Sequence, residues 1–261
     1  MLHYQAKADL LNQKNILITG AGDGIGREAA LTYSSYGANL ILVGRTLAKL
    51  EHVKQEIISN SKFIPSVSIY PLDLLTITES QCHELATDIN QNYTYLDGVL
   101  HNASILGKIA PIIDQPIKLW HDVMQVNVNA TFMLTQALLP LLLQAPNSSL
   151  IFTTSSVGRR GRANWGAYSV SKFATEGLMQ VLSDEYKETN LRVNCINPGG
   201  TRTQMRADAF PSEDPMKLKT PQEIMPLYLY LMGEDSIKES GISFDAQPNR
   251  KPGVAYYNIG V

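Results

Sequence analysis

Two side chains able to move a proton, Tyr168 and Lys172, stand four residues apart in the run Tyr168-Ser169-Val170-Ser171-Lys172. On a helix, residues four apart share one face, so the phenol and the ammonium would lie side by side. A free tyrosine titrates near pH ~10, and a neighbouring cation lowers the pKa of the phenol toward the range useful for acid–base catalysis. Ser155, thirteen residues upstream of Tyr168, adds a hydroxyl. The same Tyr-Lys spacing also occurs in ordinary helices as a surface pair, so the rest of the chain must decide.

The elements that would position these residues begin with a glycine-rich turn after the first apolar run, 15–19. The turn contains Gly20, Gly24, Ile25 and Gly26, and helical spacing follows over 27–36. A strand, a glycine turn and a helix N-terminus form a cradle for a phosphate, because glycines let the backbone approach and the helix presents unpaired N–H groups. The spacing G-x-x-x-G-x-G is a variant of the usual dinucleotide fingerprint, and no Gly-Lys-Ser/Thr closes the turn as in a P-loop. A turn without a ligand is the alternative.

The next predicted strand, 38–43, ends at Gly44-Arg45-Thr46. In a dinucleotide-binding chain, an acidic residue at this place would bind the ribose 2′-hydroxyl of NAD. Arg45 instead offers a cation for the 2′-phosphate of NADP, so the sequence favours NADP(H). A purely structural arginine is the alternative, and Asp23 argues against the phosphate because its carboxylate could sit close to it.

Polar and small residues follow the later predicted strands, 67–70, 96–100, 149–153 and 191–196. In chain order they are Asp73, then His101-Asn102-Ala103-Ser104, then Ser155, then Pro198, Gly199 and Thr203. Ligands of open α/β sheets bind outside the carboxyl ends of the strands, so these residues are candidates for one site. Asp73 is placed to accept a hydrogen bond from an adenine amino group, or it is a plain loop or capping residue.

Predicted helices over 47–60, 77–92, from Tyr168 to about 190, and over 221–232 alternate with these strands. The alternation shows no domain break, so residues 1–261 are expected to form a single α/β domain: a doubly wound parallel sheet flanked by helices on both faces. Residues 204–219 mix Pro, Met, Phe and charge, and we expect them to cover a substrate site.

The segment 120–143 is apolar on most of its helical circumference. Its most apolar run, 130–143, is too short and too often interrupted for a membrane span. A helix of this kind must bury more than its core face, which favours a subunit interface. Asn127 interrupts it with an amide that is either internally satisfied or part of a polar site.

Composition excludes several classes of function. A net charge of −2 gives no general attraction to nucleic acid or an anionic membrane. The two cysteines do not suggest a disulfide framework, the five histidines show no zinc-site spacing, and the first residues lack a secretory signal. We therefore expect a soluble cytoplasmic protein without a metal.

Taken together and in order, these motifs resemble the short-chain dehydrogenase/reductase superfamily, in its compact single-domain, Rossmann-like branch. The resemblance extends from about residue 14 to residue 244 and is closest to bacterial 3-oxoacyl-carrier-protein-reductase-like enzymes. It rests on the run 19–26, Asp73, Asn102-Ala103, Asn127, Ser155, Tyr168-x-x-x-Lys172 and Pro198-Gly199. One departure is His101-Asn102-Ala103-Ser104, where the family usually has Asn-Asn-Ala-Gly, and it bears on the geometry of that turn.

The resemblance implies a role for each matching residue. Tyr168 would be the general acid/base, Lys172 would lower its pKa and bind the nicotinamide ribose, Ser155 would hold the substrate oxygen, and Asn127 would hold a water in a proton relay. The cofactor-binding set would be Gly20, Gly24, Ile25, Gly26, Arg45, Asp73, Asn102, Ala103, Tyr168, Lys172, Pro198, Gly199 and Thr203. The implied activity is NADP-dependent interconversion of a carbonyl and an alcohol, in a homodimer or homotetramer built through the 120–143 and 166–190 helices.

Two questions stay open at the level of sequence. Arg159, Arg160 and Arg162 precede Tyr168 and either recognise an anion on the substrate or are solvated or interface residues. The alternative function is a catalytically silent NADP-binding sensor or scaffold, although such a protein has no need of a complete proton path. The substrate, the stereochemistry and the direction of the reaction do not follow from the sequence.

Overall fold

A single parallel sheet organises the computed structural model, which describes residues 4–249. Its strand order is β3-β2-β1-β4-β5-β6-β7, and every pairing is parallel. The strands are β1 (Asn15–Thr19), β2 (Asn39–Gly44), β3 (Val67–Pro71), β4 (Gly98–His101), β5 (Ser148–Thr153), β6 (Leu191–Asn197) and β7 (Ser243–Asp245). The predicted Rossmann-like, doubly wound fold is confirmed. The predicted domain limits, 1 and 261, lie outside the described residues.

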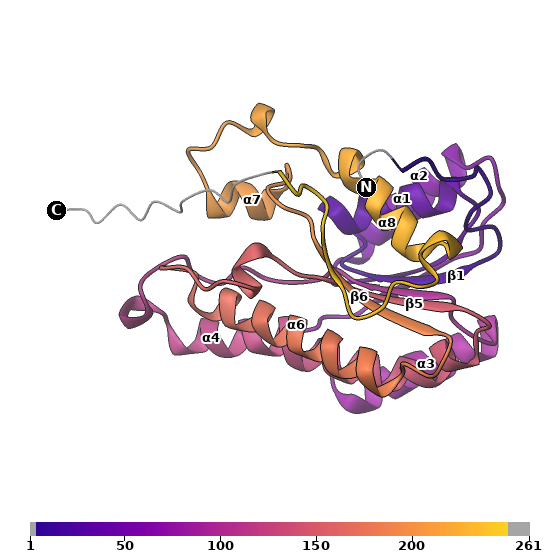
Figure 1. Ribbon diagram of the computed structural model, residues 1–261, viewed down its shortest axis with the longest axis horizontal. Coiled ribbons are helices and arrows are strands. Elements are labelled where there is room, and N and C mark those ends of the chain that lie inside the picture. The colour runs from indigo at the N-terminus through magenta and orange to yellow at the C-terminus, as the bar shows by residue number, and fades with distance from the viewer. Residues whose placement is uncertain (1–3, 250–261) are drawn as a thin grey trace.

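Helices cover both faces of the sheet (Figure 1). On one side are α1 (Gly24–Ser35), α2 (Leu47–Asn60) and α8 (Pro221–Met232), and on the other are α3 (Glu79–Tyr93), α4 (Ile117–Met124), α5 (Ala130–Gln144) and α6 (Gly166–Glu185). Each layer buries its own apolar cluster against the sheet, because a parallel sheet is apolar on both faces. A short helix, α7 (Gln204–Ala209), stands apart from these layers in Figure 1.

The strand order reverses between β1 and β4, since the chain first runs outward to β3 and then returns to the other side of β1. Such a switch point leaves a crevice at the carboxyl ends of the two strands. Thr19 at the end of β1 is in register with His101 at the end of β4, which brings the glycine turn and the Asn102 turn together.

Local sequence explains where several helices begin. Asp23 accepts a hydrogen bond from the backbone N–H of Gly24 at the start of α1. Capping boxes open α3 (Thr78 with Gln81) and α8 (Thr220 with Glu223). Each cap satisfies N–H groups that have no partner within the helix.

The predicted helix 120–143 is longer and less regular than expected. It runs continuously over Ile117–Gln144, 28 residues, and contains a π-helical turn, η2 (Gln125–Asn129). By length and composition alone this helix could cross a bilayer, because it extends well beyond the apolar run 130–143. However, 56% of its most apolar window is buried inside the molecule, and Leu134, Leu138 and Leu142 are fully buried in the cluster against the sheet. It therefore packs as a core helix of the domain.

Two other elements differ from the sequence prediction. Helix α6 ends at Glu185, five residues before the expected end, and a short irregular stretch leads to β6. Strand β7 was not expected, because its three residues lie in a polar, glycine-punctuated segment with no alternating pattern. It nevertheless extends the sheet next to β6.

Candidate active site

One cavity of about 680 Å³ opens at the carboxyl ends of the strands. Its volume is in the range of pockets that hold small molecules or cofactors. Most of the predicted site residues line it: Gly20, Gly24, Ile25, Arg45, Asp73, Asn102, Ala103, Ser155, Tyr168, Pro198, Gly199 and Thr203. Gly26, Asn127 and Lys172 lie behind this lining and support it.

The glycine turn has the close approach that a phosphate cradle needs. A Cβ atom on Gly26 would lie 2.2 Å from the carbonyl oxygen of Gly20 and 2.7 Å from Nδ2 of Asn102, so only glycine fits there. The N-terminus of α1 therefore reaches the floor of the cavity beside Asn102. Backbone N–H groups at this place are suited to a pyrophosphate, and the residues present fit a dinucleotide.

The turn after β4 is held by the neighbouring strand. The hydroxyl of Thr19 accepts hydrogen bonds from the backbone N–H groups of Asn102 (3.0 Å) and Ala103 (3.1 Å). Ser104, which replaces the glycine usual in the resembling family, does not have a positive φ angle. The turn therefore accommodates a side chain without strain at that position.

At the other end of the cavity, Arg45 follows β2 and is exposed. The carboxylate of Asp23 is paired with the ammonium of Lys49 at 2.5 Å. This hydrogen bond from Lys49 is the main reason why the pKa of Asp23 lies below its ordinary value. Lys49 thus offsets the charge that counted against a phosphate beside Arg45. Asp73 also lines the cavity, and its carboxylate accepts a hydrogen bond from the N–H of Leu75 at 3.0 Å, the turn role that the sequence left open.

The turn that carries Ser155 is fixed against the helix that carries Tyr168 and Lys172. Ser155 caps the short 3-10 helix η3 (Ser156–Gly158). A Cβ atom on Gly158 would lie 2.8 Å from backbone atoms of Lys172, so the two elements touch at a glycine. In addition, Ser169 donates a hydrogen bond of 2.6 Å to the carbonyl oxygen of Val157. The serine and tyrosine hydroxyls consequently share one cavity.

The electrostatics of Tyr168 and Lys172 differ from the prediction. Both side chains are buried, and Lys172 donates a hydrogen bond of 2.8 Å to the carbonyl oxygen of Thr153. Burial raises the pKa of Tyr168 to about 12 and lowers the pKa of Lys172 to about 8. The predicted lowering of the Tyr168 pKa is therefore wrong. Loss of hydration outweighs the effect of Lys172, whose ammonium lies 5.5 Å from the centre of the phenol ring.

Asn127 lies in the π-helical turn, which turns its amide inward. The amide oxygen accepts a hydrogen bond from the N–H of Ile105 (2.8 Å), and its nitrogen donates to the carbonyl of Ile105 (3.0 Å) and to the hydroxyl of Ser171 (3.0 Å). Asn127 thus links the 104–106 loop, which lines the cavity, to helix α6. A π-turn within an α-helix often marks a functional site.

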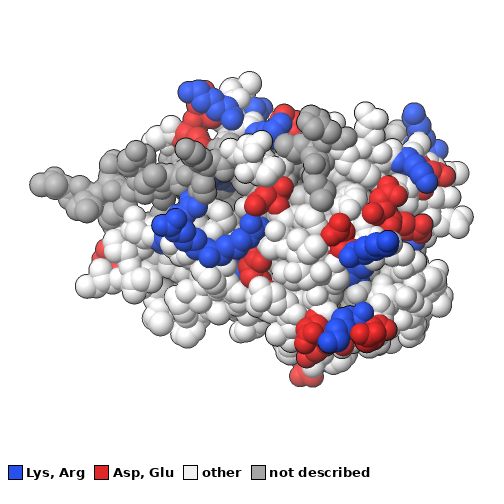
Figure 2. Space-filling view, in the orientation of Figure 1, with Lys and Arg blue, Asp and Glu red and all other residues white. Residues whose placement is uncertain are grey.

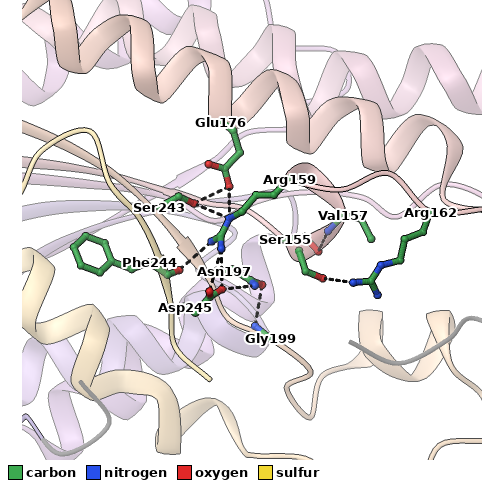
Figure 3. A network of polar contacts seen from close by, with 11 residues as sticks. Ser155, Val157, Arg159, Arg162, Glu176, Asn197, Gly199, Ser243, Phe244 and Asp245 are labelled. Atoms are coloured by element: carbon green, nitrogen blue, oxygen red, sulfur yellow. Dashed lines mark hydrogen bonds and ion pairs between the residues drawn. The ribbon is translucent and has the colours of Figure 1, made fainter. Parts of the chain in front are cut away.

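Arg159 is the centre of a polar network that sequence reasoning did not find (Figure 3). Its guanidinium donates to Glu176 on α6 (3.2 Å) and to both carboxylate oxygens of Asp245 on β7 (3.1 and 3.0 Å). Asp245 also accepts a hydrogen bond from Asn197 (2.7 Å), whose side chain in turn receives the N–H of Gly199 (3.1 Å). The network joins the end of η3, α6, the end of β6, β7 and the loop after β6. Four of its residues line the cavity themselves: Arg159, Asn197, Gly199 and Asp245.

Other residues at the site could not be found from local sequence. Lys49 lies in the first turn of α2, so its closeness to Asp23 depends on the pairing of β1 and β2. Gln247 holds the loop after β6 through the carbonyls of Pro198 (2.8 Å) and Gly200 (3.0 Å), although it lies about fifty residues further along the chain. On the face shown in Figure 2, charges of both signs are interspersed, with a short run of Lys and Arg beneath α7.

A doubly wound sheet with a glycine turn at its switch point, and a serine, a tyrosine and a lysine beside the same cavity, defines a nucleotide-dependent oxidoreductase. The sequence profile of the short chain dehydrogenase family matches residues 14–214. The chain belongs to the short-chain dehydrogenase/reductase family.

Close relatives agree with this assignment. The chain is 64% identical to the oxidoreductase YciK of Escherichia coli K12 over 97% of its own length and 100% of the relative. The crystal structure of a short-chain dehydrogenase from Shigella flexneri matches with a TM-score of 0.93 and 63% identity, covering 98% of this chain and 99% of that one. A second Shigella flexneri structure, complexed with NADP, matches with a TM-score of 0.89 and 64% identity over 93% of this chain and all of the other.

Proposed function

We propose that this protein is an NADP-dependent oxidoreductase that interconverts a carbonyl and an alcohol. The observation that carries the proposal is that Ser155 and Tyr168 line the same cavity as the glycine turn, with Lys172 buried directly behind them. A reacting oxygen between the two hydroxyls would therefore lie beside the bound cofactor. The NADP complex of the Shigella flexneri relative and the position of Arg45 support NADP over NAD.

The chain's own residues account for the proton side of this chemistry. NADPH supplies the hydride when bound. Tyr168 keeps its proton over the whole physiological range, since burial raises its pKa to about 12, and it can donate that proton to the developing alkoxide. The Ser155 hydroxyl stabilises the same oxygen as negative charge grows on it. Lys172, fixed by the carbonyl of Thr153, places an ammonium next to the phenolate that remains.

Removal of the proton donor tests the proposal. Tyr168→Phe keeps the ring in its pocket but deletes the hydroxyl, so kcat should fall roughly 10²–10⁴-fold, the usual size of general acid catalysis. NADPH binding, measured by calorimetry, should be nearly unchanged. Turnover would be measured as NADPH and NADH oxidation with oxoacyl thioesters, ketones, quinones and aldehydes. Near-normal turnover by the variant contradicts the assignment of Tyr168.

The same screen separates catalysis from the alternative function. A silent cofactor-binding sensor would bind NADPH, but it would not oxidise NADPH with any carbonyl compound in the panel. Against a sensor stands Lys172, a buried ammonium beside the Tyr168 ring that suits the proposed proton transfer and that a scaffold does not require.

We further propose a homodimer or homotetramer that assembles through the 120–143 and 166–190 helices, in the cytoplasm. Large apolar side chains are exposed along both helices: Phe132 and Leu143 on α5, and Val170, Phe173 and Val181 on α6. The cysteines Cys82 and Cys195 are buried free thiols, which suits a reducing compartment.

A further inference from the structure

An aromatic surface extends from the proposed proton donor into the cavity. The rings of Tyr168 and Trp165 are 5.8 Å apart at 49°, and the rings of Trp165 and Phe210 are 5.8 Å apart at 45°. Leu106 and Met205 pack against the same cluster and also line the cavity. The part of the cavity next to the Tyr168 hydroxyl is thus bounded by apolar side chains from three segments, which we name the aromatic wall.

The outer side of the aromatic wall is anchored at α7. Thr203 caps this helix by accepting a hydrogen bond from the N–H of Arg206. The guanidinium carbon of Arg206 lies 3.6 Å from the centre of the Phe210 ring, and the guanidinium donates two hydrogen bonds, of 2.6 and 2.7 Å, to the carboxylate of Glu213. Stacking and a two-point ion pair hold Phe210 in place from behind.

Two of the cations that line this end of the cavity, Arg206 and Arg159, already have anionic partners. Arg206 is matched by Glu213, and Arg159 is matched by Glu176 and Asp245 (Figure 3). A charged substrate would have to compete with these carboxylates and lose hydration against the aromatic wall, which is costly.

From this arrangement we propose that the substrate is an uncharged aldehyde or ketone that carries an aromatic or bulky alkyl group. The inference rests on the proposed function. The carbonyl lies at Tyr168 and Ser155, and its apolar group packs on Trp165 and Phe210. In the reduction, the hydride of NADPH forms a C–H bond with the carbonyl carbon, the C=O π electrons move to oxygen, and the Tyr168 proton completes the alcohol. NADPH is oxidised to NADP⁺, and the phenolate regains a proton from solvent.

Matched substrates test the inference by initial rates of NADPH oxidation. Benzaldehyde should exceed 4-carboxybenzaldehyde in kcat/KM by about tenfold or more, because the carboxylate must be desolvated. For straight-chain alkanals from propanal upward, kcat/KM should rise about fourfold per added methylene until the wall is covered. Preference for the carboxylated or the shortest compound overturns the inference and leaves the proposed oxidoreductase activity standing.

Two variants locate the effect on the aromatic wall. Phe210→Ala should lower kcat/KM for benzaldehyde about tenfold while changing propanal little, and Phe210→Leu, the matched control, should retain most of the activity. Glu213→Gln removes the negative partner of Arg206 and should raise the relative use of 4-carboxybenzaldehyde at least about threefold. Arg162→Gln covers the case in which the wild-type protein prefers 4-carboxybenzaldehyde. If that preference disappears in this variant, Arg162 is an anion receptor and the proposal is refuted.

A binding measurement keeps the inference testable if no turnover occurs. In a Trp120→Phe background, Trp165 is the remaining tryptophan of the chain, and its fluorescence reports occupancy of the wall. With NADPH present, benzyl alcohol should quench it at lower concentration than 4-(hydroxymethyl)benzoate. This result without any catalysis supports the apolar site and contradicts the proposed reaction, whereas tighter binding of the benzoate overturns the apolar site itself.

Discussion

Burial shifts the pKa values of the two central residues of the site, Tyr168 and Lys172, in opposite directions. The raised pKa keeps Tyr168 a neutral phenol. The lowered pKa of Lys172, about 8, means that its ammonium loses its proton not far above neutral pH. For reduction this is a useful starting state, because the phenol must carry its proton before hydride arrives and the lysine must be charged when the phenolate forms. Of these two residues, Lys172 is therefore the one expected to titrate near neutral pH.

This assignment predicts a pH profile for carbonyl reduction. Because the ammonium form is the active one, kcat/KM should be constant at low pH and fall as pH rises through about 8, the pKa of Lys172. Lys172→Arg keeps the charge at all accessible pH values and should remove the decline, at reduced overall rate. Initial rates from pH 6 to 10 measure the effect, and a wild-type profile that stays flat to pH 10 would exclude Lys172 as the controlling group.

His101 is a second buried group with a large displacement. Burial lowers the pKa of this imidazole to about 3, and the ring stacks on Phe152 and pairs with the Thr135 hydroxyl. A histidine in the unfolded chain has a pKa near ~6.5. Between pH ~6.5 and 3 the unfolded chain therefore binds a proton at His101 that the native chain does not bind. The contribution of His101 to the free energy of unfolding therefore has its full value above pH ~6.5 and is lost as pH decreases toward 3.

Replacing His101 should remove this dependence. From pH 7 to pH 5, the group accounts for about 2 kcal/mol of the loss in unfolding free energy. His101→Asn places there the residue usual in the resembling family and should lessen the wild-type loss by about that amount. Urea unfolding of both proteins at the two pH values gives the comparison. Equal losses would show that His101 does not control acid stability.

At the scale of elements, β7 is the unexpected participant. Its three residues lie at the edge of the sheet and contact the site through two side chains. Asp245 accepts hydrogen bonds from Arg159, and Ser243 donates a hydrogen bond of 2.7 Å to Glu176 on α6. Glu176 is one turn beyond Lys172 on the same helix. The network thereby fixes α6 relative to the loop after β6, and Arg159 acts as a positioning residue.

Loss of Arg159 should consequently affect catalysis as well as stability. Arg159→Ala leaves the carboxylates of Glu176 and Asp245 without their cationic partner, and kcat should fall about tenfold while the KM for the carbonyl changes less. Arg159→Lys restores the charge but not the several-point bonding, so thermal stability should recover more fully than kcat. Melting temperature and steady-state kinetics of both variants are the measurements. A stability loss with unchanged kcat would mean that the network is only structural.

Motifs made of neighbouring residues could be predicted from the sequence, and arrangements made by the sheet could not. Tyr168 with Lys172 and the glycine turn each depend on one local element, and their strands and helices were located within a few residues. Arg159 with Asp245, or Lys49 with Asp23, join residues brought together by strand pairing alone. The pKa of Tyr168 was predicted in the wrong direction because its burial depends on Trp165 and Val157 around it.

At the scale of the whole molecule, one face of α6 is left uncovered by residues 4–249, the part of the chain that the structure describes. Val170, Phe173 and Val181 are 43%, 46% and 54% exposed, and they recur at helical spacing on one side. Gly177, between them, has open space where its side chain would be. A bare glycine flanked by apolar side chains permits close approach of another helix.

Charge on this face should separate the subunits of the proposed oligomer. Phe173→Glu places a carboxylate in the proposed contact, where burial is costly, and the molar mass should fall from a multiple of the chain mass to the chain mass. Light scattering after size exclusion measures it, and Lys187→Glu on the exposed surface outside this face is the matched control. An unchanged assembly in Phe173→Glu would place the interface elsewhere.

The borders of the sheet carry a consequence for how such molecules can meet. One border strand, β3, ends at Pro71, which has no N–H group to donate. The other, β7, has three residues, and its Asp245 accepts hydrogen bonds from Arg159. Neither border presents a long row of open hydrogen-bonding groups, so a foreign strand finds little to extend. The fold is thereby guarded against strand-by-strand polymerisation.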